Sequence, residues 1–216
     1  MTVKNKYPLS LIPKLIDKLK NSTYFIKLDV WWGYNNIHIK EKDKWKVAFR
    51  TNKGLFEPTV MFFGLTNSPA TFQGFMNHIL KELIDKGHMV VYLDDILIFT
   101  SEVETHRYLV RRVLEILQEN KLYLKPEKCT FEAWEVEYLG LIVGCGTMRM
   151  DPVKIKAVNE WPKPKNKKQL QRFLGFCNFY RCFIKNYSKI ARPLYDLTRN
   201  KTWNWTEAQD KAMEEL

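Results

Sequence analysis

Two adjacent aspartates, Asp94 and Asp95, are the residues whose position in the sequence first suggests chemistry. They stand between two apolar runs, residues 89–93 and 96–99, which is the spacing of a β-hairpin with a two-residue acidic tip. Adjacent carboxylates beside buried strands raise the electrostatic energy unless a cation or solvent compensates their charge. The alternative interpretation is a solvent-exposed acidic turn, because Asp favours turns in many proteins.

A third aspartate, Asp29, ends another apolar-rich segment at residues 24–29. Carboxylates on adjacent strand ends can hold two divalent cations about 3.5–4 Å apart. A ligand set of oxygens without histidine suits magnesium rather than zinc. Such a pair of ions assists in-line attack of a hydroxyl on a phosphate, so the three aspartates indicate a polymerase or a nuclease.

The segments that must position these aspartates predict an α+β fold, with β-hairpins packed against helices rather than a wound parallel sheet. The predicted strands cover residues 24–30, 37–39, 45–51, 56–63 and 89–99, with two or three more within 122–143. The predicted helices cover residues 9–19, 68–86, 102–119, 152–161, 166–181 and 188–199. Ser68 is the expected N-cap of the second helix, with Pro69 at its first position.

The composition excludes several classes of protein. Of the 216 residues, 45% are hydrophobic, which is enough to build a core and excludes global disorder. No apolar run is long enough to cross a membrane, and residues 1–20 have no secretory signal pattern. The cysteines form no CxxC pair and lie at no zinc-ligand spacing from histidine, so we expect free thiols in a reducing compartment. These are Cys129, Cys145, Cys177 and Cys182.

The net charge of +11 is concentrated in one part of the chain. Residues 151–200 hold eight Lys and four Arg against three acidic residues, a net charge of +9, which leaves +2 for the rest. The same segment is rich in aromatic residues, and a groove for a nucleic-acid backbone needs both features. The alternative is a helical subdomain with a core of aromatic residues and solvated lysines. The aromatic residues are Trp161, Phe173, Phe176, Phe179, Tyr180, Phe183, Tyr187 and Tyr195.

Several short motifs, taken in order, resemble the reverse transcriptase of gypsy-type long-terminal-repeat retrotransposons. They read LDVWWGYNNI at residues 28–37, FGLTNSPATFQ at 63–73, YLDD at 92–95, YLG at 138–140, LGFCNFYR at 174–181 and ARPL at 191–194. The tetrapeptide YLDD is weak by itself, but the ordered set is specific and extends over nearly the whole chain.

The resemblance implies a polymerase palm with an antiparallel sheet and helices, partial fingers around residues 36–65, and a helical thumb-like C-terminal subdomain. It divides the chain into three parts. Residues 1–144 would be the palm with partial fingers, residues 145–202 a helical subdomain similar to the thumb or connection, and residues 203–216 the start of a truncated ribonuclease H region.

The resemblance also implies roles in catalysis. Asp29, Asp94 and Asp95 would be the catalytic carboxylates, with Asp29 and Asp94 as the main ligands of two Mg²⁺ ions, or of Mn²⁺ in their place. Tyr34 falls where the family has the aromatic residue that blocks a ribose 2′-hydroxyl, with core packing as the alternative. Lys128 falls where a lysine would act as general acid for pyrophosphate release, and a solvated turn lysine is the alternative.

Further positions would contact the substrates. Phe63 and Gly64 would line the incoming nucleotide and the template. The hairpin residues Tyr138, Leu139 and Gly140 would hold the primer end, and Gly140 would let two backbones approach closely. The candidates for backbone contacts in the thumb are Gln169, Arg172 and Arg181.

The partners implied are an RNA or DNA template with its primer, deoxynucleoside triphosphates and the rest of a retrotransposon polyprotein, with no membrane. The implied location is intracellular, in a cytoplasmic virus-like particle with access to the nucleus.

The sequence departs from the family pattern near Asp29 and at both ends. Trp31 and Trp32 replace a pair that is normally polar or basic, and they would crowd the path of the triphosphate. The family's triphosphate-binding basic residues lie upstream of residues 6–10, and residues 203–209 resemble the threshold of the ribonuclease H domain. Trp31 and Cys182 both stand where the family usually has Arg. We therefore expect a fragment or a decayed copy of the polyprotein.

Three functions remain open from the sequence. The leading hypothesis is an RNA-directed DNA polymerase that transfers nucleotides to a primer 3′-hydroxyl. The second is a remnant that binds nucleic acid through its basic segment without catalysis. The third, a two-metal nuclease, fits the carboxylates but neither Tyr34 nor the ordered downstream motifs.

Overall fold

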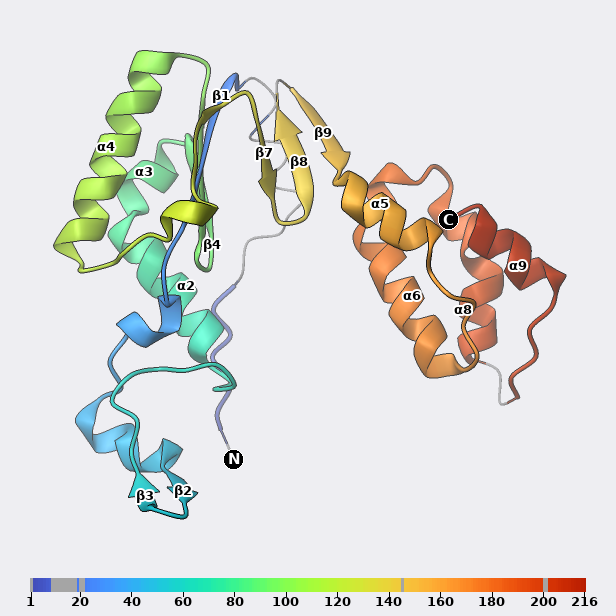
Figure 1. Cartoon of the computed structure of the whole chain (residues 1–216), viewed down its shortest axis with the longest axis horizontal. Helices are drawn as coiled ribbons and strands as arrows, with labels where there is room; N and C mark the ends of the chain where they lie inside the picture. Colours follow the sequence, from blue (N-terminus) through green and yellow to red (C-terminus); the bar gives the residue numbers. More distant parts are fainter. Residues whose placement is uncertain (1, 9–18, 20–21, 145, 200–201) are drawn as a thin grey trace. The chain divides into compact units, whose positions relative to one another are not determined.

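The computed structural model describes residues 2–8, 19, 22–144, 146–199 and 202–216. The chain forms two compact units, residues 1–148 and 149–216 (Figure 1). The helix expected at residues 9–19 lies outside the described residues except for Leu19. Among the helices that are described, none combines the length and the apolar character needed to cross a membrane.

A four-stranded antiparallel sheet is the centre of the first unit. Its strands are β1 (Tyr24–Asp29), β4 (Met89–Tyr92), β5 (Asp95–Thr100) and β6 (Thr130–Ala133), in the order β4-β5-β1-β6. Side chains alternate between the two faces of a strand. One face therefore carries Ile26, Leu28, Ile96 and Ile98, which all belong to the main core.

Helices cover this face of the sheet (Figure 1). They are α2 (Ser68–Ile79), α3 (Lys81–Asp85) and α4 (Val103–Glu119). The single helix expected at residues 68–86 is interrupted at Leu80. The N-cap is Asn67 rather than Ser68, and its side chain does not cap the helix because it binds the N-terminal segment. Asn67 Oδ1 accepts from Asn5 N at 2.9 Å and Asn67 Nδ2 donates to Val3 O at 2.9 Å.

Residues 33–63 contain less strand than expected. The elements are η1 (Gly33–Asn36), η2 (Glu41–Val47), β2 (Phe49–Thr51) and β3 (Gly54–Phe56). The strands expected at residues 37–39 and 56–63 are reduced to one isolated bridge between His38 and Val60. The strand expected at residues 45–51 begins as a 3-10 helix. Every residue of β2 and β3 is exposed, so this hairpin has no core to extend it, and Pro58 cannot donate to a ladder.

A smaller sheet consists of β7 (Glu135–Tyr138), β8 (Leu141–Gly144) and β9 (Thr147–Met150), of which β9 was not expected. The tight turn between β7 and β8 is Leu139–Gly140, because Tyr138 pairs with Leu141. Both turn residues have positive φ, 52° and 78°, which twists the hairpin correctly and favours glycine at one of them. Strand β7 packs against β1, on the face opposite the helices.

The second unit is helical, as expected. Its helices are α5 (Pro152–Asn159), α6 (Lys167–Phe179), η4 (Arg181–Phe183), α7 (Tyr187–Ile190), α8 (Arg192–Arg199) and α9 (Glu207–Glu214). The helix expected at 188–199 is divided into α7 and α8, and α9 was not expected. Asp151 and Asn166 cap α5 and α6 by accepting backbone N–H bonds. Leu170, Phe173, Leu194 and Ala212 belong to the core, and the partly buried Trp203 and Trp205 pack against it.

Candidate active site

Asp29 and Asp95 are cross-strand neighbours. Asp29 is the last residue of β1 and Asp95 the first residue of β5, and the antiparallel register places them opposite each other. Directly opposed residues point to the same face of a sheet, with Cβ atoms about 4.5–5.5 Å apart. This face is opposite the helices, and the hydrogen bond from Val30 N to Asp94 O, 2.9 Å, closes the end of the ladder.

Asp94 lies in the hairpin turn, where the sequence placed both acidic residues. Because Tyr92 pairs with Asp95, the two turn residues are Leu93 and Asp94, and Asp95 already belongs to the strand. The predicted tip is thus wrong by one residue. Leu93 takes the positive φ of 54° that the tight turn requires. This one-residue shift gives the two adjacent aspartates different surroundings, because Asp94 lies in the turn and Asp95 in β5.

Two lysines neutralise the paired carboxylates. Lys27 Nζ lies 3.3 Å from Asp95 Oδ1, and Lys128 Nζ lies 3.3 Å from Asp29 Oδ2. Lys128 ends η3 (Pro126–Lys128), which is held close to β1 by the bond from Lys125 N to Asp29 O, 2.9 Å. The Asp29 carboxylate, by hydrogen bond and by charge, raises the pKa of Lys128. Lys128 is therefore paired with a candidate catalytic aspartate, although 56% of its side chain remains exposed.

The carboxylate of Asp94 interacts electrostatically with the carboxylates of Asp29 and Asp95. Burial, followed by the charges of Asp95 and Asp29, raises the pKa of Asp94, while its backbone hydrogen bond and Lys128 oppose the rise. Three carboxylates thus share one partly buried region, which is the electrostatic setting that a cation stabilises.

The donor set suits a divalent cation, because its members are carboxylate oxygens. Within the part of the chain that is described, no three His, Cys, Asp or Glu side chains are close enough to surround one ion. Two of the three carboxylates are paired with lysines, Asp29 with Lys128 and Asp95 with Lys27.

Tyr34 lies in an aromatic group beside Asp94. Its ring centroid is 5.0 Å from that of Phe63 and 5.7 Å from that of the fully buried Phe72. Burial and then the charge of Asp94 raise the pKa of Tyr34. Tyr34 is half-buried, so its ring packs against Phe63 and Phe72 while part of the residue stays accessible to solvent. Phe63 is exposed and the next residue, Gly64, has a φ of 101°.

The sequence did not identify Gln73 as a site residue. In the structure, its side chain holds the Leu93–Asp94 turn in place. It is fully buried in α2, where its Oε1 accepts from Leu93 N at 2.8 Å and its Nε2 donates to Val91 O at 3.1 Å. It thereby fixes the backbone on the N-terminal side of Asp94. A signal existed, because Gln73 is a polar residue within the buried stripe of α2 that includes Phe72 and Met76.

The sequence did not identify Lys27 as a site residue either, although it pairs with Asp95. The two charged residues of β1, Lys27 and Asp29, are two positions apart, and the other residues of the strand are aromatic or aliphatic. A lysine two residues before an acidic strand end points to the same face and can serve as a counter-charge.

Tyr138, Leu139 and Gly140 form the end of the β7–β8 hairpin. Tyr138 is buried, and burial together with the charge of Asp95 raises the pKa of its phenol. Its hydroxyl has no hydrogen-bond partner among the described residues. The hairpin that was expected to hold the primer end therefore approaches the carboxylates through Tyr138.

The rings of Trp31 and Trp32 contact each other, with centroids 4.9 Å apart, and both are exposed. Trp32 has a left-handed φ of 54°, and Asn36 Nδ2 donates to Trp31 O at 2.9 Å. The expected crowding of a triphosphate stays a prediction.

The remaining candidates belong to the second unit. Gln169, Arg172 and Arg181 are all exposed. Gln169 Oε1 accepts from Lys165 N at 2.7 Å, and Arg181 donates to Asn178 Oδ1 at 3.0 Å. Their roles in binding stay predictions.

An antiparallel sheet with opposed aspartates at its strand ends and helices behind it fits the α+β fold of a polymerase. The chain belongs to the reverse transcriptase (RNA-dependent DNA polymerase) family, whose model matches residues 1–143. It is 40% identical over 213 residues to the Retrovirus-related Pol polyprotein from transposon opus of Drosophila melanogaster. It is 38% identical over 213 residues to the Transposon Tf2-3 polyprotein of Schizosaccharomyces pombe. These alignments cover 99% and 98% of the chain but 21% and 16% of the relatives, so the chain spans about a fifth of their length.

Solved structures agree with this family. The foamy viral protease-reverse transcriptase in complex with RNA/DNA hybrid matches with a TM-score of 0.88 and 26% identity, over 99% of this chain and 29% of that one. A second structure of that protein, in complex with double-stranded DNA, matches with a TM-score of 0.89 and 26% identity, over 99% and 38% of the two chains. The predicted α+β polymerase fold and the predicted family are confirmed.

Proposed function

We propose that this chain carries out the RNA-directed DNA polymerase reaction of a retrotransposon polyprotein. A primer 3′-hydroxyl would attack the α-phosphate of a deoxynucleoside triphosphate and release pyrophosphate. The observation that supports this most is the opposed pair Asp29–Asp95 with Asp94 in the adjoining turn. The polymerase family and its divalent-ion chemistry agree with that arrangement.

Asp29 and Asp94 would hold the metal, which we propose to be a pair of Mg²⁺ ions, with Asp95 close by. Bound ions supply positive charge for the attacking hydroxyl and the leaving pyrophosphate. Lys128 would exchange its contact with Asp29 for the pyrophosphate and donate a proton to it. Contact with Asp29 raises the pKa of Lys128, so the ammonium holds its proton while that contact lasts.

Tyr34 would select the sugar. Its ring is backed by Phe72 and Phe63, so it cannot yield easily to a ribose 2′-hydroxyl. The charge of Asp94 acts on the Tyr34 phenol, so the sugar and the metal ligands would share one site.

The partners follow from this reaction. We propose an RNA or DNA template with a primer, held near Phe63, Gly64 and the Tyr138–Gly140 turn, and by Gln169, Arg172 and Arg181 of the second unit. The foamy viral relatives bind an RNA/DNA hybrid and double-stranded DNA. We also propose a palm with partial fingers in the first unit, a thumb in the second, and an intracellular particle as the location.

Primer extension on an RNA template tests the proposal, both for this chain and for the complete polyprotein. Asp94→Asn keeps the size of the side chain, and it should reduce extension at least about a hundredfold, because a metal ligand is lost. Asp85→Asn is the matched control, because Asp85 is an exposed residue of α3 paired with Lys81. Equal extension by wild type and Asp94→Asn would refute the site.

A second function is supported by the exposed Trp31 and Trp32 next to Asp29 and by the basic second unit. A chain that only binds nucleic acid would show affinity for duplexes that falls steeply with salt and does not depend on sequence. Binding of this kind in the complete absence of Mg²⁺-dependent extension would favour that function over the polymerase.

A further inference from the structure

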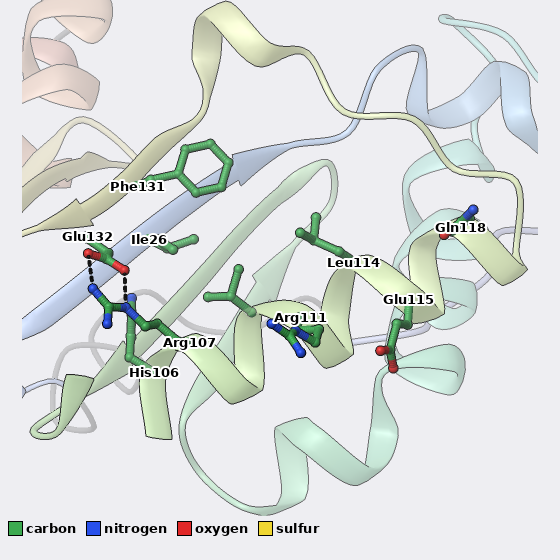
Figure 2. A pocket seen from close by; sticks show the side chains of 10 residues that line it. Ile26, His106, Arg107, Arg111, Leu114, Glu115, Gln118, Phe131 and Glu132 are labelled. Atoms are coloured by element: carbon green, nitrogen blue, oxygen red, sulfur yellow. Dashed lines mark hydrogen bonds and ion pairs between the residues drawn. The ribbon is translucent and has the colours of Figure 1, made fainter. Parts of the chain in front are cut away.

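A cavity of about 550 Å³ lies between α4 and β6 in the first unit (Figure 2). Most of the wall surface is apolar, and Ile26, Val110, Leu114 and Phe131 are the apolar residues of a lining that also holds polar and charged side chains. Cavities of this size, with an apolar lining and a few polar groups, are typical of small-ligand sites. The cavity is separate from the carboxylates, because Ile26 lies on the face of β1 opposite to Asp29.

The helical wall is one continuous stripe of α4. Arg107, Val110, Arg111, Leu114 and Gln118 recur at three- and four-residue intervals, so they share one side of the helix. Leu114 is 37% exposed although its neighbour Val113 is in the core. This side of α4 therefore presents an apolar strip between two arginines.

The opposite wall is made by a bulge in β6. The register between β1 and β6 shifts between Phe25 and Lys27, so an extra residue is inserted in β6. Glu132 in the bulge has a φ of 43°, which is unusual for a residue with a side chain. Its carboxylate forms a bidentate pair with Arg107, accepting from Nε at 2.7 Å and from Nη2 at 3.2 Å (Figure 2). The adjacent Phe131 is 55% exposed and supplies a ring surface.

His106 is a buried polar group of this cavity that lacks a partner. It is fully buried, and its Nε2 has no hydrogen-bond partner among the described residues. The other nitrogen, Nδ1, is 3.0 Å from Thr100 Oγ1, and that hydroxyl donates its single hydrogen to Glu102 O at 3.0 Å. Nδ1 must therefore donate to Thr100, and in the neutral ring Nε2 is an acceptor. A buried acceptor of this kind calls for an N–H or O–H donor.

Arg111 is the uncompensated charge of the cavity. The charge of Glu132 is met by Arg107, and Glu115 pairs with Arg112 at 3.0 Å. Arg111 makes no ion pair or hydrogen bond through its side chain with any residue that the structure describes. One unpaired guanidinium beside an apolar lining matches one carboxylate on an apolar ligand.

We propose that the cavity between α4 and β6 binds a small aromatic monoanion that also carries one hydrogen-bond donor. The ring packs between Leu114 and Phe131, the carboxylate pairs with Arg111, and the donor binds His106 Nε2. The observations that carry this are the cavity, the orphaned acceptor and the single uncompensated cation, and the proposal does not depend on polymerase activity.

Three probes separate the contributions. Indole-3-acetate has the ring, the carboxylate and an N–H donor. Naphthalene-1-acetate keeps a fused ring and the carboxylate but has no N–H, and indole-3-acetamide keeps the N–H but has no charge. Titration of the ¹⁵N-labelled 216-residue chain should give saturable shifts at amides of α4 and β6 with indole-3-acetate. Each of the other two probes should bind about tenfold more weakly, because one polar group is left unpaired.

Protein variants provide the second arm. Arg111→Gln should weaken indole-3-acetate binding about tenfold, because the charged partner of the carboxylate is lost. Arg111 is exposed, so the substitution should leave the fold intact. Lys81→Gln is the matched control, because it removes an exposed positive charge of α3 outside the cavity lining, and it should change the affinity less than about twofold. The proposal is overturned if no saturable shift occurs at millimolar probe, if the three probes bind equally, or if Arg111→Gln and Lys81→Gln have equal effects.

Discussion

Asp29 lies directly opposite Asp95 in the antiparallel register of β1 and β5. Two like charges in this position destabilise a sheet. The structure offsets the repulsion with Lys27 on Asp95 and Lys128 on Asp29. The site therefore combines paired carboxylates with their own displaceable cations.

Replacing Lys27 by Met should lower the free energy of unfolding by about 1–3 kcal/mol, because Asp95 would lose its partner in a partly buried pair. Urea denaturation in metal-free buffer measures this. Lys27→Arg keeps the charge and should stay within about 0.5 kcal/mol of the wild type. An unchanged urea midpoint for Lys27→Met would show that Lys27 does not compensate Asp95.

Replacing Gln73 by Leu should cost about 2 kcal/mol or more, because Leu93 N–H and Val91 C=O would lose a buried partner. Primer extension should fall too, since the backbone before Asp94 would be released. Gln73→Glu retains the acceptor for Leu93 N–H and should lose less activity than Gln73→Leu. If Gln73→Leu extends primers like the wild type, the turn does not need this support.

The raised pKa of Asp94 predicts how stability depends on pH. The folded state holds the Asp94 proton more tightly than the unfolded chain, so this residue makes the fold less stable as pH rises from the ordinary Asp pKa through the raised one. Asp94→Asn should therefore be more stable than the wild type at neutral pH without metal. The difference should shrink as the pH falls to about 4, where the unfolded chain is protonated as well.

Urea midpoints measured across this pH range, in the presence of a chelator, provide the test for Asp94. Asp85→Asn removes an exposed carboxylate and should give no gain in stability at any pH. A wild type that is more stable than Asp94→Asn at neutral pH would contradict the raised pKa of Asp94, which burial and the charges of Asp95 and Asp29 cause.

Gly33 should not tolerate a side chain. A Cβ there would lie 3.0 Å from Phe72 Cζ and 3.6 Å from Asp94 Cβ, and Phe72 is fully buried. Gly33→Ala should cost about 1–3 kcal/mol through overpacking. Gly175→Ala is the control, because it lies inside α6 with no atom within 4 Å of its Cβ, and it should stabilise the chain by up to about 1 kcal/mol. Equal thermal midpoints for the two variants would refute the close approach at Gly33.

The local sequence predicted most of the elements that form the site. The apolar runs at residues 24–29 and 89–99 form β1, β4 and β5. Most residues of these strands are buried on both faces of the sheet, so their apolar character alone predicts a strand. The local sequence did not predict the elements correctly where the residues are exposed, as in the β2–β3 hairpin. It also missed α9, which has few apolar residues.

The sequence by itself determined the family and the α+β class and identified the three aspartates as candidate site residues, because these depend on residue types and on short-range spacing. Only the tertiary structure decided which groups meet. Lys128 reaches Asp29 across 99 residues, and Gln73 reaches Leu93 across 20. The same holds for the cavity beside His106, which exists because a bulge in β6 faces α4. Strand register and helix packing are set by contacts between distant segments, and no local pattern encodes them.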